Sequence, residues 1–241
     1  SSFPLVIDAI SEQIKKTTQY CTPYTYSKQM IEYAERLTSV YPGNVKAKIC
    51  FGNSGSDASD AAIKFARAYT GRKKIISFIN SYHGNTLGAT SLSACTIRMR
   101  EKIGPLLPEI YHFTFKGCND NFVSKNNLIG DIEQAFSTYL PPSDVAAVII
   151  EPMQGDGGLN MALPEFIHQL YALCKKYGIL FISDEVQQGF FRNNHWFGIE
   201  NFNVVPDGVI LGKSLGAGLV LGAFMAKSEI IDSLQAPAHA F

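Results

Sequence analysis

The chain has 241 residues, of which 46% are hydrophobic and 17% charged, and its 21 lysines and arginines balance its 21 acidic residues. This composition is typical of a globular domain and excludes a disordered or fibrous chain. A formal charge of zero gives no electrostatic reason to expect nucleic acid or an anionic membrane as a partner. No apolar run approaches the roughly 20 residues that a membrane-spanning helix needs.

The five cysteines are odd in number and widely spaced, and there is no Cys-x-x-Cys pair that would indicate a zinc or redox centre. We therefore expect reduced thiols, no bound metal and a cytoplasmic location. The chain starts and stops abruptly, and we expect it to be part of a longer protein.

The first element with a functional signal is a predicted helix over residues 57–69, which Gly71 ends. The glycine-rich turn 52–57 precedes it, so free backbone N–H groups lie at the positive end of the helix dipole. That geometry suits a phosphate group. The turn lacks the lysine of a Walker loop and the spacing of a dinucleotide fingerprint. Plain capping of the helix by Ser56 or Asp57 is the alternative.

Two predicted strands are followed by residues that can contact a ligand. Strand 74–78 leads to Tyr82-His83-Gly84, which offers an aromatic face for stacking. Strand 145–150 leads to a glycine-rich loop that contains Glu151 and Asp156. A plain turn explains the glycines of this loop, but it does not explain why acids take two of its positions.

The remaining elements indicate the fold class. After the loop-like stretch 119–128 we predict a helix over 130–140, and a second helix over 164–177 begins at a proline and ends before Gly178. Further strands are predicted at 179–183, 208–211 and 221–226. Strands that alternate with helices predict an α/β fold with a mainly parallel sheet flanked by helices.

Two of these strands end on charged side chains. Asp184 and Glu185 follow strand 179–183, at the end where open α/β sheets keep their ligands, and a carboxylate there needs a cation or hydrogen-bond donors. Lys213 follows strand 208–211, where an amine removed from water is a Schiff-base nucleophile. Taken singly, a loop-capping carboxylate and a solvated lysine explain them equally well.

One ligand explains all of these features together. A phosphate-binding turn, an aromatic face, a carboxylate and a lysine match the phosphate, the ring, the pyridine nitrogen and the aldehyde of pyridoxal 5'-phosphate (PLP). No nucleotide needs that set. We therefore expect PLP as the cofactor, with Lys213 holding it as a Schiff base and Asp184 facing its ring nitrogen.

Several motifs occur in the order of one known family: Asn53-Ser54-Gly55-Ser56-Asp57-Ala58, Tyr82-His83-Gly84, Ile150-Glu151-Pro152-Met153-Gln154-Gly155, Asp184-Glu185-Val186-Gln187-Gln188-Gly189-Phe190, Pro206-Asp207 and Gly212-Lys213-Ser214-Leu215. Through them nearly the whole chain resembles the class III aminotransferases, which are PLP enzymes of fold type I. The resemblance implies that residues 1–241 form the PLP-binding large domain. Segments near 1–40 and 230–241 would lead to the rest of a longer protein.

The resemblance implies how the site holds the cofactor's phosphate and ring. Gly55 and Ser56 would supply backbone donors to the phosphate. Tyr82 and Val186 would cover the two faces of the ring. Because this family builds its site across a two-fold interface, the resemblance also implies a homodimer or a dimer of dimers.

The resemblance implies roles for four further residues. Asp184 would keep the pyridine nitrogen protonated, and Gln187 would bind the phenolic oxygen. Glu151 resembles a supporting active-site acid. Lys213 would bind the cofactor covalently and move the proton between the substrate carbon and the cofactor.

Two reactions remain open. Most aminotransferases of this class have Glu where this chain has Asp156, whereas the loop 154–158 is similar to that of the amino-acid racemases and epimerases of the family, and residues 51–72 resemble its isoleucine 2-epimerases. Racemisation needs an acid–base group on each face of the substrate carbon, so Asp156 would oppose Lys213. Transamination needs only Lys213.

We expect amino-group transfer between an amino acid or amine and a 2-oxo acid, with racemase or 2-epimerase activity as the alternative. A non-catalytic PLP-binding relative is a third alternative. The intact Lys213, Asp184 and Gln187 argue against it.

Overall fold

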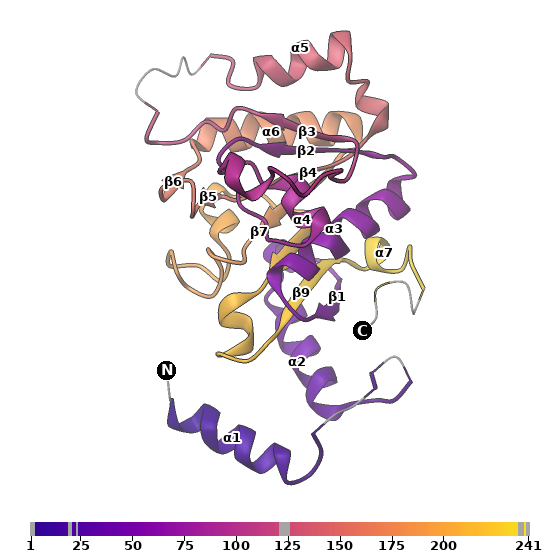
Figure 1. Ribbon diagram of the computed structural model, residues 1–241, viewed down its shortest axis with the longest axis vertical. Helices are drawn as coiled ribbons and strands as arrows, with labels where there is room; N and C mark the ends of the chain where they lie inside the picture. The colour runs from indigo at the N-terminus through magenta and orange to yellow at the C-terminus, as the bar shows by residue number, and fades with distance from the viewer. Residues whose placement is uncertain (1–2, 19–20, 23, 121–125, 236–238, 240–241) are drawn as a thin grey trace.

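A seven-stranded sheet runs through the molecule, and helices cover both of its faces (Figure 1). The computed structural model describes residues 3–18, 21–22, 24–120, 126–235 and 239. The strands of this sheet are β1 (Ala47–Gly52), β2 (Lys74–Phe78), β3 (Ile110–Phe113), β4 (Val145–Ile150), β7 (Leu180–Asp184), β8 (Gly208–Leu211) and β9 (Gly222–Lys227). Their spatial order is β1-β9-β8-β7-β4-β2-β3.

The helices lie before, between and after these strands. They are α1 (Pro4–Ile14), α2 (Lys28–Ser39), α3 (Gly55–Thr70), α4 (Leu87–Leu92), α5 (Gly130–Thr138), α6 (Pro164–Tyr177) and α7 (Ser228–Ile231). Two short strands, β5 (Met153–Gln154) and β6 (Asn160–Met161), form a separate ribbon. Among the described residues, no helix is both long and apolar enough to cross a membrane.

The predicted, mainly parallel α/β sheet is confirmed, and within the described chain β9 is its reversed strand. The pairs β2·β3, β2·β4, β4·β7 and β7·β8 are parallel, whereas β9 is antiparallel to both β8 and β1. The cause is the connection between β8 and β9, residues 212–221, which is too short for the helical crossover that a parallel pair requires.

The core consists of two layers, one on each face of the sheet. Along β4, Val148 and Ile150 pack into the cluster that contains α6, whereas Ala147 and Ile149 pack into the cluster that contains α3. This alternation follows from the period of two residues in a strand. Because both faces are covered, every residue of β4 is buried and the strand is an unbroken apolar run.

The predicted bounds agree closely with the observed ones. Strands 74–78, 145–150 and 208–211 and helix 164–177 match. Strands 179–183 and 221–226 are shifted by one residue toward the C-terminus at both ends in the structure. The helix predicted over 130–140 ends at Thr138. Part of the loop-like stretch 119–128 lies outside the described residues. The elements without a sequence prediction are β1, β3, β5, β6, α1, α2, α4 and α7.

The helix predicted over 57–69 begins earlier, at Gly55, because its N-cap is Ser54. The Ser54 hydroxyl accepts a hydrogen bond from the backbone N–H of Asp57 at 3.1 Å. Capping by Ser56 or Asp57 is therefore wrong, although the Asp57 carboxylate accepts from the N–H of Asn53 at 2.8 Å. The helix ends as predicted at Gly71, which has a left-handed φ of 68°.

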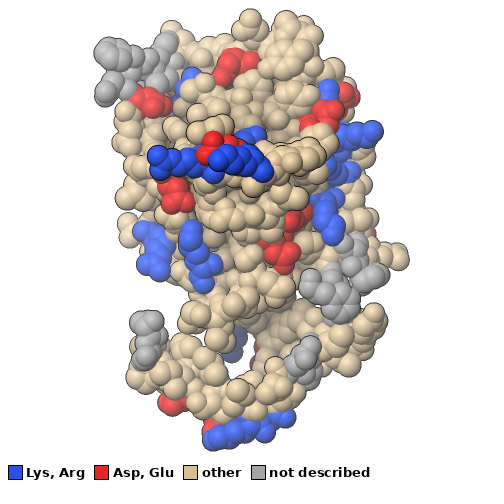
Figure 2. Space-filling view, in the orientation of Figure 1, with Lys and Arg blue, Asp and Glu red and all other residues tan. Residues whose placement is uncertain are grey.

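Basic and acidic side chains are interspersed over the face of the molecule that Figure 2 shows. This mixed pattern agrees with the formal charge of zero. α1 lies apart from the sheet at one end of the molecule (Figure 1), and none of its residues is buried.

Candidate active site

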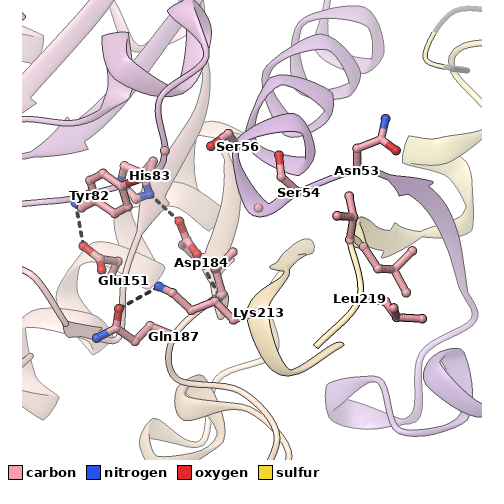
Figure 3. Close-up of a pocket in the computed structure, with 15 residues that line it drawn as sticks. Asn53, Ser54, Ser56, Tyr82, His83, Glu151, Asp184, Gln187, Lys213 and Leu219 are labelled. Carbon is pink, nitrogen blue, oxygen red and sulfur yellow. Dashed lines mark hydrogen bonds and ion pairs between the residues drawn. The ribbon is translucent and has the colours of Figure 1, made fainter. Parts of the chain in front are cut away.

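A cavity of about 290 Å³ lies where β4, β7 and β8 end and α3 begins (Figure 3). The carboxyl ends of parallel strands meet at one edge of a sheet, which is why residues far apart in the sequence converge here. All eight residues that the sequence predicts as cofactor-binding line the cavity: Gly55, Ser56, Tyr82, Glu151, Asp184, Val186, Gln187 and Lys213.

The first turn of α3 forms one end of the cavity. The N–H groups of Asn53 and Asp57 are bound by side chains of the turn, but those of Gly55 and Ser56 have no partner in the part of the chain that the structure describes. A Cβ atom at residue 55 would lie 2.9 Å from both methyl groups of Val186. Because Gly55 has no side chain, its backbone N–H is accessible from the cavity, at a helix terminus that attracts anions.

Asp184 and His83 form a buried pair behind the cavity. Asp184 Oδ2 lies 2.6 Å from His83 Nδ1, and Asp184 Oδ1 accepts from the N–H of Val186 at 3.0 Å. Burial lowers the pKa of His83, but the hydrogen bond and charge of Asp184 and the charge of Glu151 outweigh it, so the pKa is raised from 6.5. The raised pKa of His83 reflects its close hydrogen bond with Asp184.

His83 is a site residue that the sequence analysis did not assign. Its Nε2 atom is buried and has no hydrogen-bond partner among the described residues. The available signal was its place between Tyr82 and Gly84 in the quoted motif. The sequence also gave no role to the lining residues Asn53, Ser54, Gly84 and 219–221.

Lys213 lies near Asp184 in the cavity (Figure 3) and donates from Nζ to Gln187 Oε1 at 2.8 Å. Its φ of 45° is left-handed, a conformation that costs a non-glycine residue on the order of 1 kcal/mol and is typical of functional sites. The expectation that Lys213 is desolvated is wrong for this chain, because the side chain is exposed. The cause is an open rim, since residues 217–220 beyond it are exposed too.

Glu151 lies at the end of β4 and joins two loops of the cavity wall. Its Oε2 accepts from the N–H of Tyr82 at 3.1 Å, and its Oε1 accepts from the N–H of Gly155 at 3.3 Å. Burial raises the pKa of Glu151 to about 7, while the charge of His83 lowers it and that of Asp184 raises it further.

Asp156 is exposed and is not one of the residues that line the cavity. Its charge nevertheless reaches the site, because after burial it is the next cause that raises the pKa of Tyr82. The structure therefore brings Lys213 and the cofactor-binding set together and leaves Asp156 at their edge. Its role as a second base stays a prediction.

The side chains present fit PLP. The unpaired N–H groups at Gly55 and Ser56 suit its phosphate, and a buried carboxylate hydrogen-bonded to an imidazole suits a protonated ring nitrogen. Tyr82 offers an aromatic surface in the same cavity, and the amine of Lys213 is free of any salt bridge with the described residues.

The fold matches that of solved transaminases. An amine transaminase from an uncultivated Pseudomonas species, solved in its PLP-bound form, has a TM-score of 0.88 and 29% identity over 99% of this chain and 57% of that chain. The taurine:2-oxoglutarate aminotransferase of Bifidobacterium kashiwanohense has a TM-score of 0.88 and 30% identity over 96% of this chain and 53% of that chain. The chain thus has the fold of the fold-type I PLP-dependent enzymes.

The chain belongs to the class III aminotransferase family, whose model matches residues 2–241. The isoleucine 2-epimerase of Lentilactobacillus buchneri is 42% identical over 98% of this chain and 54% of its own length. The 5-aminovalerate aminotransferase of Pseudomonas aeruginosa is 36% identical over 96% of this chain and 54% of its own length. The chain spans about half the length of the curated relatives it matches.

Proposed function

We propose that the chain is the PLP-binding large domain of an aminotransferase that moves an amino group between an amino acid or amine and a 2-oxo acid. One observation supports the proposal most: a single cavity is lined by Lys213, the buried Asp184–His83 pair and the N-terminal turn of α3 with its unpaired N–H groups. Transfer needs one proton-handling amine near the substrate carbon, and Lys213 supplies it. Asp156, the second base that racemisation would need, is not on the cavity wall.

Each element of the site has one task in this proposal. PLP, when bound, supplies an electron sink for the reaction. The N–H groups of Gly55 and Ser56 bind its phosphate, and Asp184 holds the proton on its ring nitrogen. His83 binds Asp184 at 2.6 Å from behind the cavity and holds the carboxylate in place. Lys213 Nζ would take the proton from the substrate carbon and pass it to the cofactor, which is the direction that amino-group transfer requires.

Borohydride reduction tests the assignment of Lys213. The full-length protein should be yellow, and reduction should fix the cofactor covalently on Lys213, as peptide mapping would reveal. Lys213→Ala should lose both the visible absorbance and the transfer of amino groups to a 2-oxo acid. An adduct on Lys227, which in this structure binds Asp207 at 2.6 Å, would refute the assignment.

A second candidate, inversion at the α-carbon, is favoured by two observations. The chain is 42% identical to an isoleucine 2-epimerase and 36% identical to the alanine/serine racemase of Pyrococcus horikoshii, which matches 95% of this chain over 50% of its own length. In addition, the charge of Asp156 acts on Tyr82 at the cavity wall.

Deuterated water separates the two reactions. The full-length enzyme would be incubated with a branched amino acid, with and without a 2-oxo acid. An aminotransferase gives a new 2-oxo acid only when the acceptor is present. An epimerase gives the inverted amino acid, deuterated at the α-carbon, without any acceptor, and Asp156→Asn then abolishes the inversion. Inversion without an acceptor would replace the first candidate by the second.

The proposal extends to assembly and location. The family resemblance supports a homodimer or a dimer of dimers, as does the exposed apolar surface of α1, where Leu5 is 71% exposed and Ile14 60%. The five cysteines are all free, which supports a cytoplasmic enzyme.

A further inference from the structure

Glu151 connects the loop after β4, to which it belongs, with the Tyr82 loop after β2. Tyr82 lies 69 positions before Glu151 and Gly155 lies only four positions after it, in the Gly155 loop that Glu151 itself belongs to, and both donate a backbone N–H to its carboxylate. The residue is 5% exposed. A single buried carboxylate therefore sets the separation of these two loops.

Each loop carries a part of the site. Tyr82 brings its ring to the cavity wall. Gly155 supports Gln187, because a Cβ at residue 155 would lie 2.3 Å from Gln187 Nε2. Gln187 in turn accepts the hydrogen bond of Lys213. A shift of the Glu151 carboxylate would thus move the aromatic wall and the support of Gln187 together.

Both hydrogen bonds are strongest when the Glu151 carboxylate is ionised, because both of its oxygens then accept. A protonated carboxyl turns one of its oxygens into a donor and weakens it as an acceptor, so it cannot hold two N–H donors equally well. The titratable groups that face Glu151 are His83 from the loop after β2, Asp184 from β7 and Cys95 from the segment after α4. Burial is the largest influence on Glu151, and it places the pKa at about 7.

We propose that Glu151 is a positioning residue whose ionised carboxylate holds the Tyr82 and Gly155 loops around the cofactor, so that the grip on the cofactor weakens when this carboxylate takes up a proton. The inference rests on the proposed binding of PLP. It assigns Glu151 no contact with the reacting atoms. Glu151 acts only through the two backbone N–H groups that it binds.

The test compares the PLP dissociation constants of the full-length apo-protein and two variants between pH 5.5 and 8.5, by equilibrium dialysis. In the wild type, affinity should fall on the order of tenfold as the pH decreases through about 7, since only the ionised form of Glu151 holds both loops. Glu151→Gln should bind on the order of tenfold more weakly at pH 8 and should lack this part of the pH dependence.

Glu185→Gln is the matched control. Glu185 is also fully buried, and burial also raises its pKa to about 7, but it binds Ser183, Gly198 and Ile199 rather than the two cavity loops. This variant should keep the wild-type step near pH 7, which shows that removing a buried carboxylate as such does not abolish it. A step caused by the PLP phosphate would persist in both variants, so its loss in Glu151→Gln alone assigns it to Glu151. A Glu151→Gln profile that coincides with the wild type would overturn the inference, as would a step that disappears equally in Glu185→Gln.

A measurement on the wild type covers the case in which Glu151→Gln fails to fold. With carboxyl-labelled glutamate, the NMR titration midpoint of Glu151 should move to lower pH when PLP binds, because binding selects the ionised form. An unchanged midpoint would overturn the inference while leaving the proposed function intact. A wild type that binds no PLP would overturn both.

Discussion

At the scale of single residues, the site depends on charges that are buried and paired. Asp184 is 3% exposed and His83 also 3%, and a carboxylate at that depth needs a hydrogen-bonding partner, which the imidazole 2.6 Å away supplies. The sequence could place Asp184 and Lys213, because each follows a buried strand. It could not reveal the His83 partner, because the two residues are 101 positions apart and meet only in the folded chain.

We predict that Asp184→Asn binds PLP but loses activity by roughly three orders of magnitude, because an amide cannot hold the proton on the ring nitrogen. The measurement is kcat in the full-length enzyme with the cofactor content checked by absorbance. Asp207→Asn is the control: Asp207 is also a buried carboxylate, but it binds Lys175 and Lys227 away from the cavity. It should lower stability and leave kcat of the folded enzyme unchanged. Normal activity in Asp184→Asn would make Asp184 a structural acid.

We predict that Gly155→Ala lowers activity on the order of tenfold with little loss of stability. The new methyl group would overlap the amide of Gln187, which is the flexible end of a side chain and moves away easily. The move removes the acceptor that holds Lys213 Nζ. Gly158→Ala is unsuitable as a control because of its left-handed φ of 103°, so Gly104→Ala, where the new Cβ meets only one atom, at 3.9 Å, serves instead. Full activity in Gly155→Ala would show that Gln187 does not need this support.

At the scale of elements, burial decided which parts of the fold the sequence could predict. β4 and α6 matched their predictions because an apolar run covered on both faces, and a proline and glycine at the helix ends, are local signals. The direction of β9 was not a local signal, because it depends on the length of the connection before it. The contact of Glu151 with Tyr82 could not be predicted for a related reason, since Tyr82 lies 69 positions away.

Glu185 shows how one buried acid ties two elements together, and its effect on stability has a definite sign. Its carboxylate accepts from Gly198 and Ile199 at 2.7 and 2.9 Å and so fixes the 3-10 helix η4 (Gly198–Phe202) to the end of β7. Burial outweighs these hydrogen bonds and raises the pKa of Glu185 from 4.5 to about 7. Between these values the folded chain keeps a proton that the unfolded chain has lost, so the free energy of unfolding falls as the pH rises.

We therefore predict that Glu185→Gln makes this decline shallower between pH 4.5 and 7, by up to about 1.4 kcal/mol per pH unit. Urea unfolding at a series of pH values measures it. The variant is expected to be less stable overall, since an amide oxygen cannot replace both carboxylate oxygens, so the slope is the quantity to compare. Glu101→Gln, a change at an exposed acid, should leave the slope as it is. An identical slope in Glu185→Gln would mean that the pKa of Glu185 is the same in the folded and the unfolded chain.

At the scale of the whole molecule, α1 is the element that the sheet does not explain. It has no buried residue and lies apart from the sheet at the end of the molecule opposite α5 (Figure 1), where Gln29 of α2 donates to its Gln13 at 3.2 Å. Several of its apolar side chains are exposed, among them Leu5 at 71% and Ile14 at 60%. A helix with such a surface gains free energy when a partner covers it, at roughly 25 cal/mol for each Å² of apolar area.

We predict that the full-length protein is a homodimer or a dimer of dimers and that the double substitution Leu5→Ser and Ile14→Ser raises the dimer dissociation constant by at least about tenfold. Light scattering over a dilution series measures the change. Tyr139→Ser is the control, because Tyr139 is 61% exposed beside α5, far from α1, and its loss should leave the assembly intact. Activity should fall along with the dimer if the partner subunit completes the site. A wild-type protein that is monomeric and fully active at every concentration would contradict both the assembly and the two-fold site that the family resemblance implies.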